Sequence, residues 1–288
     1  MKIALIPPKG LEGFALHSKF HLTLPLVELL RNPNYVNVYQ RAKRGGDYVV
    51  MDNGIAEGIK FTGAELLAAA SIFGANEIVL PDTLGDAKQT LSRVRTFLEH
   101  YSTPLAESGI EKMMAVAQGT ALQSVKNTIN AFADMPKVTC IGIPRHLIKT
   151  TGSTSIRIDV ANWIASAHKD RFEIHLLGAD AAARKEIRWA ATYAPHIRSI
   201  DSSMPFNYAL AGYALDTVGN IYRPGQYFDR AWGITANVDL VKHNIAVFRG
   251  WANGEQSGLE KASGSEVRGV SATGGERQVR TLPKPFNS

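Results

Sequence analysis

The sequence predicts an α/β protein folded as one (β/α)8 barrel of the TIM type, with some irregularity. Short apolar runs recur along the chain, and the intervals between them leave room for one helix each. The runs are apolar throughout instead of alternating, as in parallel strands that are buried on both faces. Polar residues follow nearly every run, whereas an open doubly wound sheet would gather them at one switch point.

Seven strands follow from these apolar runs. An eighth strand lies either in Gly219–Phe228 or before Tyr48. The predicted strands are Lys2–Ile6, Tyr48–Asp52, Glu77–Pro81, Met113–Gln118, Val138–Ile143, Phe172–Leu177 and Ile197–Asp201.

Segments between the strands have the apolar spacing of amphipathic helices. Gly74 is placed to end the first of them, and Asp86 to cap the second. The predicted helices are Ala64–Phe73, Asp86–His100, Ala121–Phe132, Ile156–His168, Ala181–Tyr193 and Val238–Trp251.

The composition predicts one barrel domain over residues 1–251 and a flexible tail over 252–288. The tail is rich in Gly, Ser and charged residues and has hardly any large apolar side chain, so it cannot offset the entropy lost on ordering. The N-terminal apolar run is too short for a secretion signal, and no segment reaches the roughly 20 apolar residues of a membrane span. A cytoplasmic protein is expected, in the host cytoplasm if a phage encodes it.

The 288 residues carry a formal charge of +6 and a single cysteine, Cys140. The positive charge favours a polyanionic partner, and nucleic acid is the natural candidate. One cysteine excludes an intramolecular disulfide and a cysteine-rich zinc subdomain. The histidines lack the spacing of metal ligands, so no metal or other cofactor is expected.

Carboxylates at the ends of two predicted strands are the candidate catalytic groups. Asp201 ends one strand, and such a carboxylate can attack an anomeric carbon to form a covalent glycosyl-enzyme. Asp52, in Asp-Asn-Gly, is a candidate general acid and base, and Gly54 allows a ligand to approach the backbone closely. The structural alternatives are a helix cap at Asp201 and an Asx-turn at Asp52.

Other strand ends carry groups suited to binding a purine. Asp82 can accept two hydrogen bonds from the N1–H and the exocyclic amine of a guanine-like ring. Gln118 offers an amide to a heterocycle, Gly119 leaves the backbone accessible, and Gly142 can present its N–H to a carbonyl oxygen. Phosphate contacts are expected from Arg145 and His146, and from the basic turn at Lys43 and Arg44, for which solvated loops are the alternative.

Taken in order, these segments resemble the tRNA-guanine transglycosylase superfamily, especially its small phage and bacterial members that insert 7-deazaguanine bases into DNA. Asp52-Asn53-Gly54 stands where the family has Asp-Ser-Gly-Gly with its acid/base aspartate. Asp82 matches the base-recognising aspartate, Gln118-Gly119 matches Val-Gln-Gly, and Gly142 matches a glycine whose backbone contacts the base. Leu177-Gly178 resembles Leu-Met-Gly, and Asp201 with Met204-Pro205 resembles the nucleophile motif Asp-x-x-x-Pro.

The chain departs from the family pattern in two places. It cannot build the Cys3His zinc subdomain of the tRNA-modifying enzymes, which favours DNA over tRNA as the substrate. The aromatic residue that stacks on the base is also missing, and Ile55, Leu177 or Phe206 is left as its replacement.

The resemblance implies queuosine-related base exchange: guanine in DNA is replaced by a 7-deazaguanine such as 7-cyano-7-deazaguanine through an aspartyl-glycosyl intermediate. A tRNA-guanine transglycosylase, a non-catalytic nucleic-acid-binding subunit of the same fold and an N-glycosidic hydrolase are the alternatives. A monomer and a homodimer both stay open.

Overall fold

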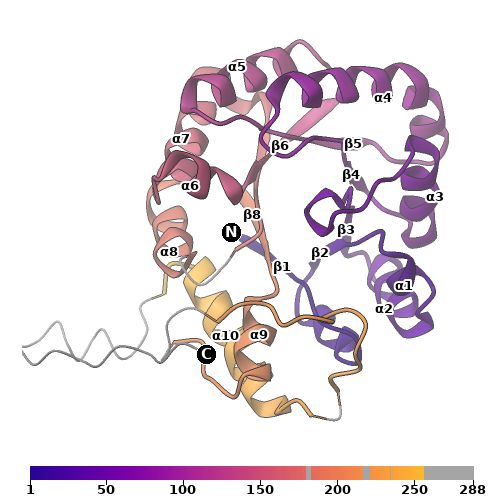
Figure 1. Ribbon diagram of the computed structural model, residues 1–288, viewed down its shortest axis with the longest axis vertical. Coiled ribbons are helices and arrows are strands. Elements are labelled where there is room, and N and C mark those ends of the chain that lie inside the picture. Colours follow the sequence, from indigo (N-terminus) through magenta and orange to yellow (C-terminus); the bar gives the residue numbers. More distant parts are fainter. Residues whose placement is uncertain (180–182, 217–220, 234, 256–288) are drawn as a thin grey trace, which may run out of the picture. The chain divides into compact units, whose positions relative to one another are not determined.

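Strands and helices alternate in the computed structural model, which describes residues 1–179, 183–216, 221–233 and 235–255 (Figure 1). Within these residues eight strands pair in parallel, in the order β1-β8-β7-β6-β5-β4-β3-β2. The predicted α/β barrel of the TIM type is thereby confirmed. The strands are β1 (Lys2–Leu5), β2 (Phe20–Thr23), β3 (Tyr48–Met51), β4 (Glu77–Val79), β5 (Lys112–Val116), β6 (Val138–Pro144), β7 (Glu173–Leu177) and β8 (Ile197–Ser202).

The eighth strand is β2, which lies before Tyr48, at one of its two predicted positions. Its polar residues find partners inside the protein: Nε2 of His21 contacts Asp47 at 3.0 Å, and the Thr23 hydroxyl donates to the carbonyl of Val50 at 3.0 Å. These polar residues interrupt the apolar pattern, which is why the run is hard to recognise. Residues 221–228, in the other predicted position, form loop and turn.

The barrel is nearly closed, and its irregular feature is the seam between β1 and β2. These strands lie side by side, but no backbone ladder joins them in the described part of the chain. The hydroxyl of Ser18 instead donates to the carbonyl of Ile3 and accepts from the N–H of Phe20 at 3.2 Å. One side chain therefore bridges two strand edges that would otherwise leave backbone groups unpaired.

Helices surround the strands on the outside (Figure 1). Most begin and end close to the predicted positions, although α4 continues seven residues past His100. The α-helices are α1 (Val27–Leu30), α2 (Pro33–Arg44), α3 (Gly63–Phe73), α4 (Ala87–Glu107), α5 (Leu122–Ala133), α6 (His146–Thr151), α7 (Ile156–His168), α8 (Ala183–Tyr193), α9 (Met204–Leu210) and α10 (Val238–Ala252). Three short 3-10 helices are η1 (Glu12–His17), η2 (Ile55–Glu57) and η3 (Lys169–Arg171).

Local sequence signals explain several helix ends. Thr62 and Glu65 form a capping box at the start of α3, and Gly74 ends that helix with a φ of 59°. Asp86 accepts a hydrogen bond of 2.8 Å from the N–H of Gln89, which confirms it as the cap of α4. These caps fix where each helix starts relative to the preceding strand end.

A charged layer fills the amino-terminal end of the barrel. Arg198 forms ion pairs of 2.8 Å with Glu77 and 3.0 Å with Glu173, and the Tyr48 hydroxyl donates to Glu77 at 2.7 Å. Lys112 pairs with Glu173 at 2.8 Å. Because buried charges need partners, this network closes one end of the barrel with mutually satisfied groups. Open space for a ligand lies at the carboxyl end.

None of the helices in the described residues combines the length and apolarity that a bilayer crossing requires. Residues 256–288, most of the predicted tail, lie outside the described residues, as do Ala181 and its neighbour at the predicted start of α8.

Candidate active site

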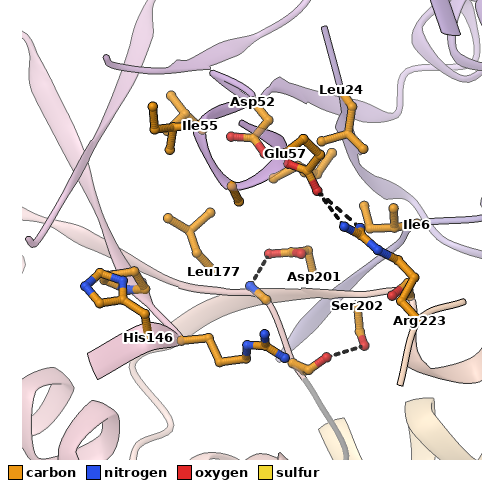
Figure 2. A pocket seen from close by; sticks show the side chains of 18 of the residues that line it. Ile6, Leu24, Asp52, Ile55, Glu57, His146, Leu177, Asp201, Ser202 and Arg223 are labelled. Atoms are coloured by element: carbon orange, nitrogen blue, oxygen red, sulfur yellow. Dashed lines mark hydrogen bonds and ion pairs between the residues drawn. The ribbon is translucent and has the colours of Figure 1, made fainter. Parts of the chain in front are cut away.

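A cavity of about 540 Å³ lies at the carboxyl ends of the strands (Figure 2). This is the end of a TIM barrel at which active sites are built. Every strand contributes at least one lining residue, from the strand itself or from the loop that follows it. These residues include Ile6, Leu24, Asp52, Asp82, Gln118, Pro144, Leu177 and Asp201.

The cavity brings together most of the predicted site residues, although they are far apart in sequence. The two candidate catalytic carboxylates share it with four of the six residues expected to bind a base and with two of the four expected to bind phosphate. The predicted residues that line it are Asp52, Asp82, Gln118, Arg145, His146, Leu177, Gly178 and Asp201.

Asp201, at the end of β8, is held through one oxygen. Its Oδ1 accepts a hydrogen bond from the N–H of Gly178 at 2.7 Å and lies at hydrogen-bond distance, 3.1 Å, from Nε2 of His175. Asp201 is not the cap of α9, because that helix begins three residues later, at Met204, and its N-cap is Ser203. The carboxylate lines the cavity, and Figure 2 shows it directed into the same space as Asp52 and Glu57. Its orientation suits attack on an electrophilic carbon held there.

Asp52 follows β3 in a tight turn that Asn53 makes. The side-chain oxygen of Asn53 accepts from the N–H of Ile55 at 3.0 Å, so the Asx-turn belongs to Asn53 and not to Asp52. Gly54 is needed because its φ is 71° and a Cβ would lie 3.2 Å from Pro25. Burial, and then the charges of Glu57 and Asp201, raise the pKa of Asp52 well above its ordinary value. Such a carboxyl group holds a proton that it can donate.

Asp82 is almost completely buried after β4 and is held by two amides. Asn53 donates to its Oδ1 at 2.7 Å, and Gln118 donates to its Oδ2. The orientation of Gln118 is fixed in turn, since its Oε1 accepts from the N–H of Gly85 at 2.9 Å. Burial raises the pKa of Asp82, and these hydrogen bonds oppose the rise. The two predicted base-binding side chains therefore form one connected unit at the cavity wall.

Two predicted glycines do not line the cavity. A Cβ on Gly142, within β6, would lie 2.7 Å from the side chain of Leu177. The group that lies close to the Gly142 backbone is therefore the Leu177 side chain. A Cβ on Gly119 would lie 2.5 Å from Ser124 Oγ at the start of α5. At both positions neighbouring side chains pack closely against the glycine backbone, which gives glycine a structural role there beside the ligand contact expected from sequence.

Lys43 and Arg44 lie far from the cavity along the fold. They are the last two residues of α2, and the chain then enters β3 at its first residue, Tyr48. Asp52 lies at the other end of β3, directly after its last residue. The basic turn therefore lies at the amino ends of the strands, at the opposite end of the barrel from Arg145 and His146.

Among the residues considered for stacking on a base, Ile55 and Leu177 line the cavity. Phe206 does not. It is completely buried in α9, where its ring packs edge-on against Phe14 with centroids 6.5 Å apart. The aromatic side chain of Tyr222 also lines the cavity.

The cavity also contains residues that the sequence analysis did not identify. Glu57, in η2, receives two bonds from Arg223, of 3.1 and 3.2 Å, across the mouth of the cavity (Figure 2). Burial raises the pKa of Glu57, and Arg223 opposes the rise. Arg223 is 166 positions away and lies in an irregular loop, so no local pattern could have linked the two residues. Asn207, from α9, is a further lining residue.

Three buried polar atoms of lining residues have no hydrogen-bond partner in the described protein: Glu57 Oε2, His146 Nε2 and Asn207 Oδ1. Buried polar atoms are normally satisfied, and these three could pair with polar groups of a ligand in the cavity. Within the described ranges, no group of three His, Cys, Asp or Glu side chains is arranged to hold a metal ion.

Comparisons with known proteins add no family assignment. A scan against protein-family models finds no match, and no curated protein matches the sequence.

Proposed function

We propose that this protein exchanges guanine in a nucleic acid for a 7-deazaguanine base, through a covalent bond between Asp201 and the sugar. The observation that carries the proposal is the convergence of Asp52, Asp82 and Asp201 on one cavity. The ordered resemblance of their segments to the tRNA-guanine transglycosylase superfamily supports the same reading and supplies the chemistry.

In the first half-reaction a carboxylate oxygen of Asp201 attacks C1′ of the target nucleoside. The O–C1′ bond forms as the C1′–N9 bond breaks, and the bonding electrons leave with guanine. Asp52 supplies the proton that neutralises the departing base, a role that fits its raised pKa. The hydrogen bonds to Oδ1 hold Asp201 in place during the attack.

In the second half-reaction the incoming 7-deazaguanine gives its N9 proton to Asp52. N9 then attacks C1′, and the carboxylate of Asp201 leaves with the electrons of the O–C1′ bond. Two inversions give net retention at C1′. One glycosidic bond replaces another, so the reaction needs no external energy source.

Base recognition is assigned to Asp82 and Gln118. Asp82 keeps lone pairs beyond those used by Asn53 and Gln118, and these can accept the N1–H and amine of a guanine-like ring. The target nucleotide must leave the base stack to reach this depth, at a cost of a few kcal/mol. Arg145, exposed at the mouth, is placed to contact backbone phosphates.

DNA is favoured over tRNA as the polymer because Cys140 is the only cysteine and lies buried in β6. The zinc subdomain of the tRNA-modifying members cannot be assembled from it. A non-catalytic binding subunit is disfavoured, because carboxylates clustered beside a phosphate backbone weaken binding by charge repulsion. A subunit that only binds gains nothing from them, whereas an enzyme uses them for catalysis.

Incubation with a DNA oligonucleotide, a tRNA and radiolabelled guanine tests the proposal. We expect label to enter the DNA, and unlabelled 7-cyano-7-deazaguanine to displace it. Asp201→Asn should abolish incorporation, whereas Asp86→Asn should retain it. Asp86→Asn is a matched control because Asn also caps helices and Asp86 lies outside the cavity. Incorporation by Asp201→Asn, or release of guanine without incorporation, would overturn the proposal.

A further inference from the structure

A completely buried histidine connects the candidate nucleophile with the charged layer at the far end of the barrel. His175 lies in β7 and contacts Asp201 through Nε2 and Ser199 through Nδ1, at 3.1 and 2.8 Å. Ser199 Oγ also accepts from Nε of Arg198 at 3.1 Å. We propose that Arg198, Ser199 and His175 are positioning residues, forming a hydrogen-bond chain with one direction that orients Asp201. The proposal rests on the function proposed above.

The direction of the chain follows from the chemistry of its two ends. Arg198 can only donate, so Ser199 Oγ must accept from it. The single hydroxyl proton of Ser199 is then available for Nδ1 of His175. At the other end, an ionised Asp201 can only accept, so Nε2 of His175 must carry the proton. Both ends therefore require the same neutral Nε2–H tautomer.

The opposite tautomer is disfavoured at both ends. It would point a lone pair of Nε2 at the carboxylate of Asp201 and leave the Ser199 hydroxyl proton without its acceptor. Charged groups around His175 come from two strands: Asp201 and Arg198 from β8, and Glu77 from β4. Burial lowers the pKa of His175, with Asp201 opposing this change, and so supports the neutral ring.

Arg198, the first residue of the hydrogen-bond chain, is itself held in place by several contacts. Arg198 is paired with Glu77 and Glu173, and its guanidinium lies over the rings of Phe20 and Tyr48, at 5.2 and 5.7 Å from their centroids. Such stacking and pairing restrict the planar guanidinium to one orientation. The chain transmits this orientation to Oδ1 of Asp201 and leaves Oδ2 for attack on C1′.

The hydrogen-bond chain through His175 can be tested without an activity measurement. The ¹⁵N NMR signals of the His175 imidazole, assigned by their loss in His175→Gln, report its tautomer and protonation state. We expect a neutral Nε2–H ring at neutral pH. An Nδ1–H tautomer, or a doubly protonated ring, would overturn the chain whether or not the protein exchanges bases.

The positioning role is tested with the isosteric pair Ser199→Thr and Ser199→Val, which differ in the hydroxyl alone. Ser199→Thr should retain the tautomer and the exchange rate. Ser199→Val should weaken the tautomer preference, which Asp201 alone then maintains, and lower kcat by about tenfold to a hundredfold at unchanged KM, the range expected for a slightly misplaced reactive group. His196→Gln, at an exposed position, is the control.

The outcomes separate the two proposals. Equal kcat values for Ser199→Thr and Ser199→Val, in a protein that exchanges bases, would overturn the positioning role and leave the proposed function intact. An Nε2–H tautomer in a protein that exchanges no base would support the hydrogen-bond chain and overturn the proposed function.

Discussion

The side-chain amide of Asn53 donates a hydrogen bond of 2.7 Å to Oδ1 of Asp82, and so joins the turn after β3 to the loop after β4. The same amide donates to the carbonyl of Leu80 at 2.8 Å. Asn53 directly follows the candidate acid, Asp52, and is bonded to Asp82, the candidate base-recognition residue. A residue that fixes two candidate functional groups is expected to affect ligand binding without taking part in the chemistry.

Replacing the amide of Asn53 by a carboxylate should weaken base binding. Asn53→Asp keeps an acceptor for the N–H of Ile55 but removes the donor to Asp82 and places two acids together. We expect KM for guanine to rise about tenfold or more, and the free energy of unfolding to fall by roughly 1–3 kcal/mol. Steady-state kinetics and urea titration measure both. Asn237→Asp is the control because either residue caps α10. Equal KM values in the two variants would contradict the assigned role.

The raised pKa of Asp52 makes stability depend on pH in a defined direction. Between the ordinary carboxyl pKa, about 3.9, and the raised value, the folded chain keeps a proton that the unfolded chain releases, so stability falls as pH rises through this window. Asp52→Asn should therefore increase the free energy of unfolding at pH 7, by on the order of 1 kcal/mol. The gain should vanish below about pH 4, where Asp52 is protonated in both states.

Urea titrations at pH 4 and pH 7 measure this difference, and base exchange should be lost in Asp52→Asn at both. Asp86→Asn serves again as the comparison, since its carboxylate caps a helix near the surface. A stability gain for Asp52→Asn that is the same at both pH values would show that the raised pKa is not its source.

Nucleic-acid binding should depend on Arg145, a basic residue at the cavity end of the barrel. Arg145→Gln should weaken binding of a DNA oligonucleotide and reduce the slope of log K against log salt by about 0.7–0.9, the change for one lost phosphate contact. Lys43→Gln and Arg44→Gln remove the same charge at the opposite end and should leave the slope unchanged. Fluorescence anisotropy across a salt series distinguishes these cases. A larger effect at Lys43 or Arg44 would place the polymer on the other face.

Much of the barrel could be predicted from the sequence because its strands are continuous apolar runs and its helices have strong periodicity and caps. The distinction between Asp82 and Asp86 also followed from pattern: a helix begins directly after Asp86, and the structure confirms that this residue is the cap. β2 was difficult to recognise because His21 and Thr23 are polar residues that find their partners only in the folded barrel.

Other features depend on contacts that sequence patterns do not contain. The pairing of Glu57 with Arg223 and the chain through His175 join separate elements, and the strand register beside His175 is shifted. Gly142 was expected to present its backbone N–H to a ligand, but only the fold shows that the side chain of Leu177 packs against it. The position of Lys43 and Arg44 follows from chain direction, since a helix that leads into a strand ends at that strand's amino end.

The most direct test of the central claim is intact-protein mass spectrometry of an acid-quenched reaction with a short guanine-containing DNA oligonucleotide. We predict an adduct equal to the mass of the oligonucleotide less guanine, which peptide mapping locates at Asp201 and which free 7-cyano-7-deazaguanine discharges. An adduct on another residue, or guanine exchange that proceeds undiminished in Asp201→Asn, would contradict the account.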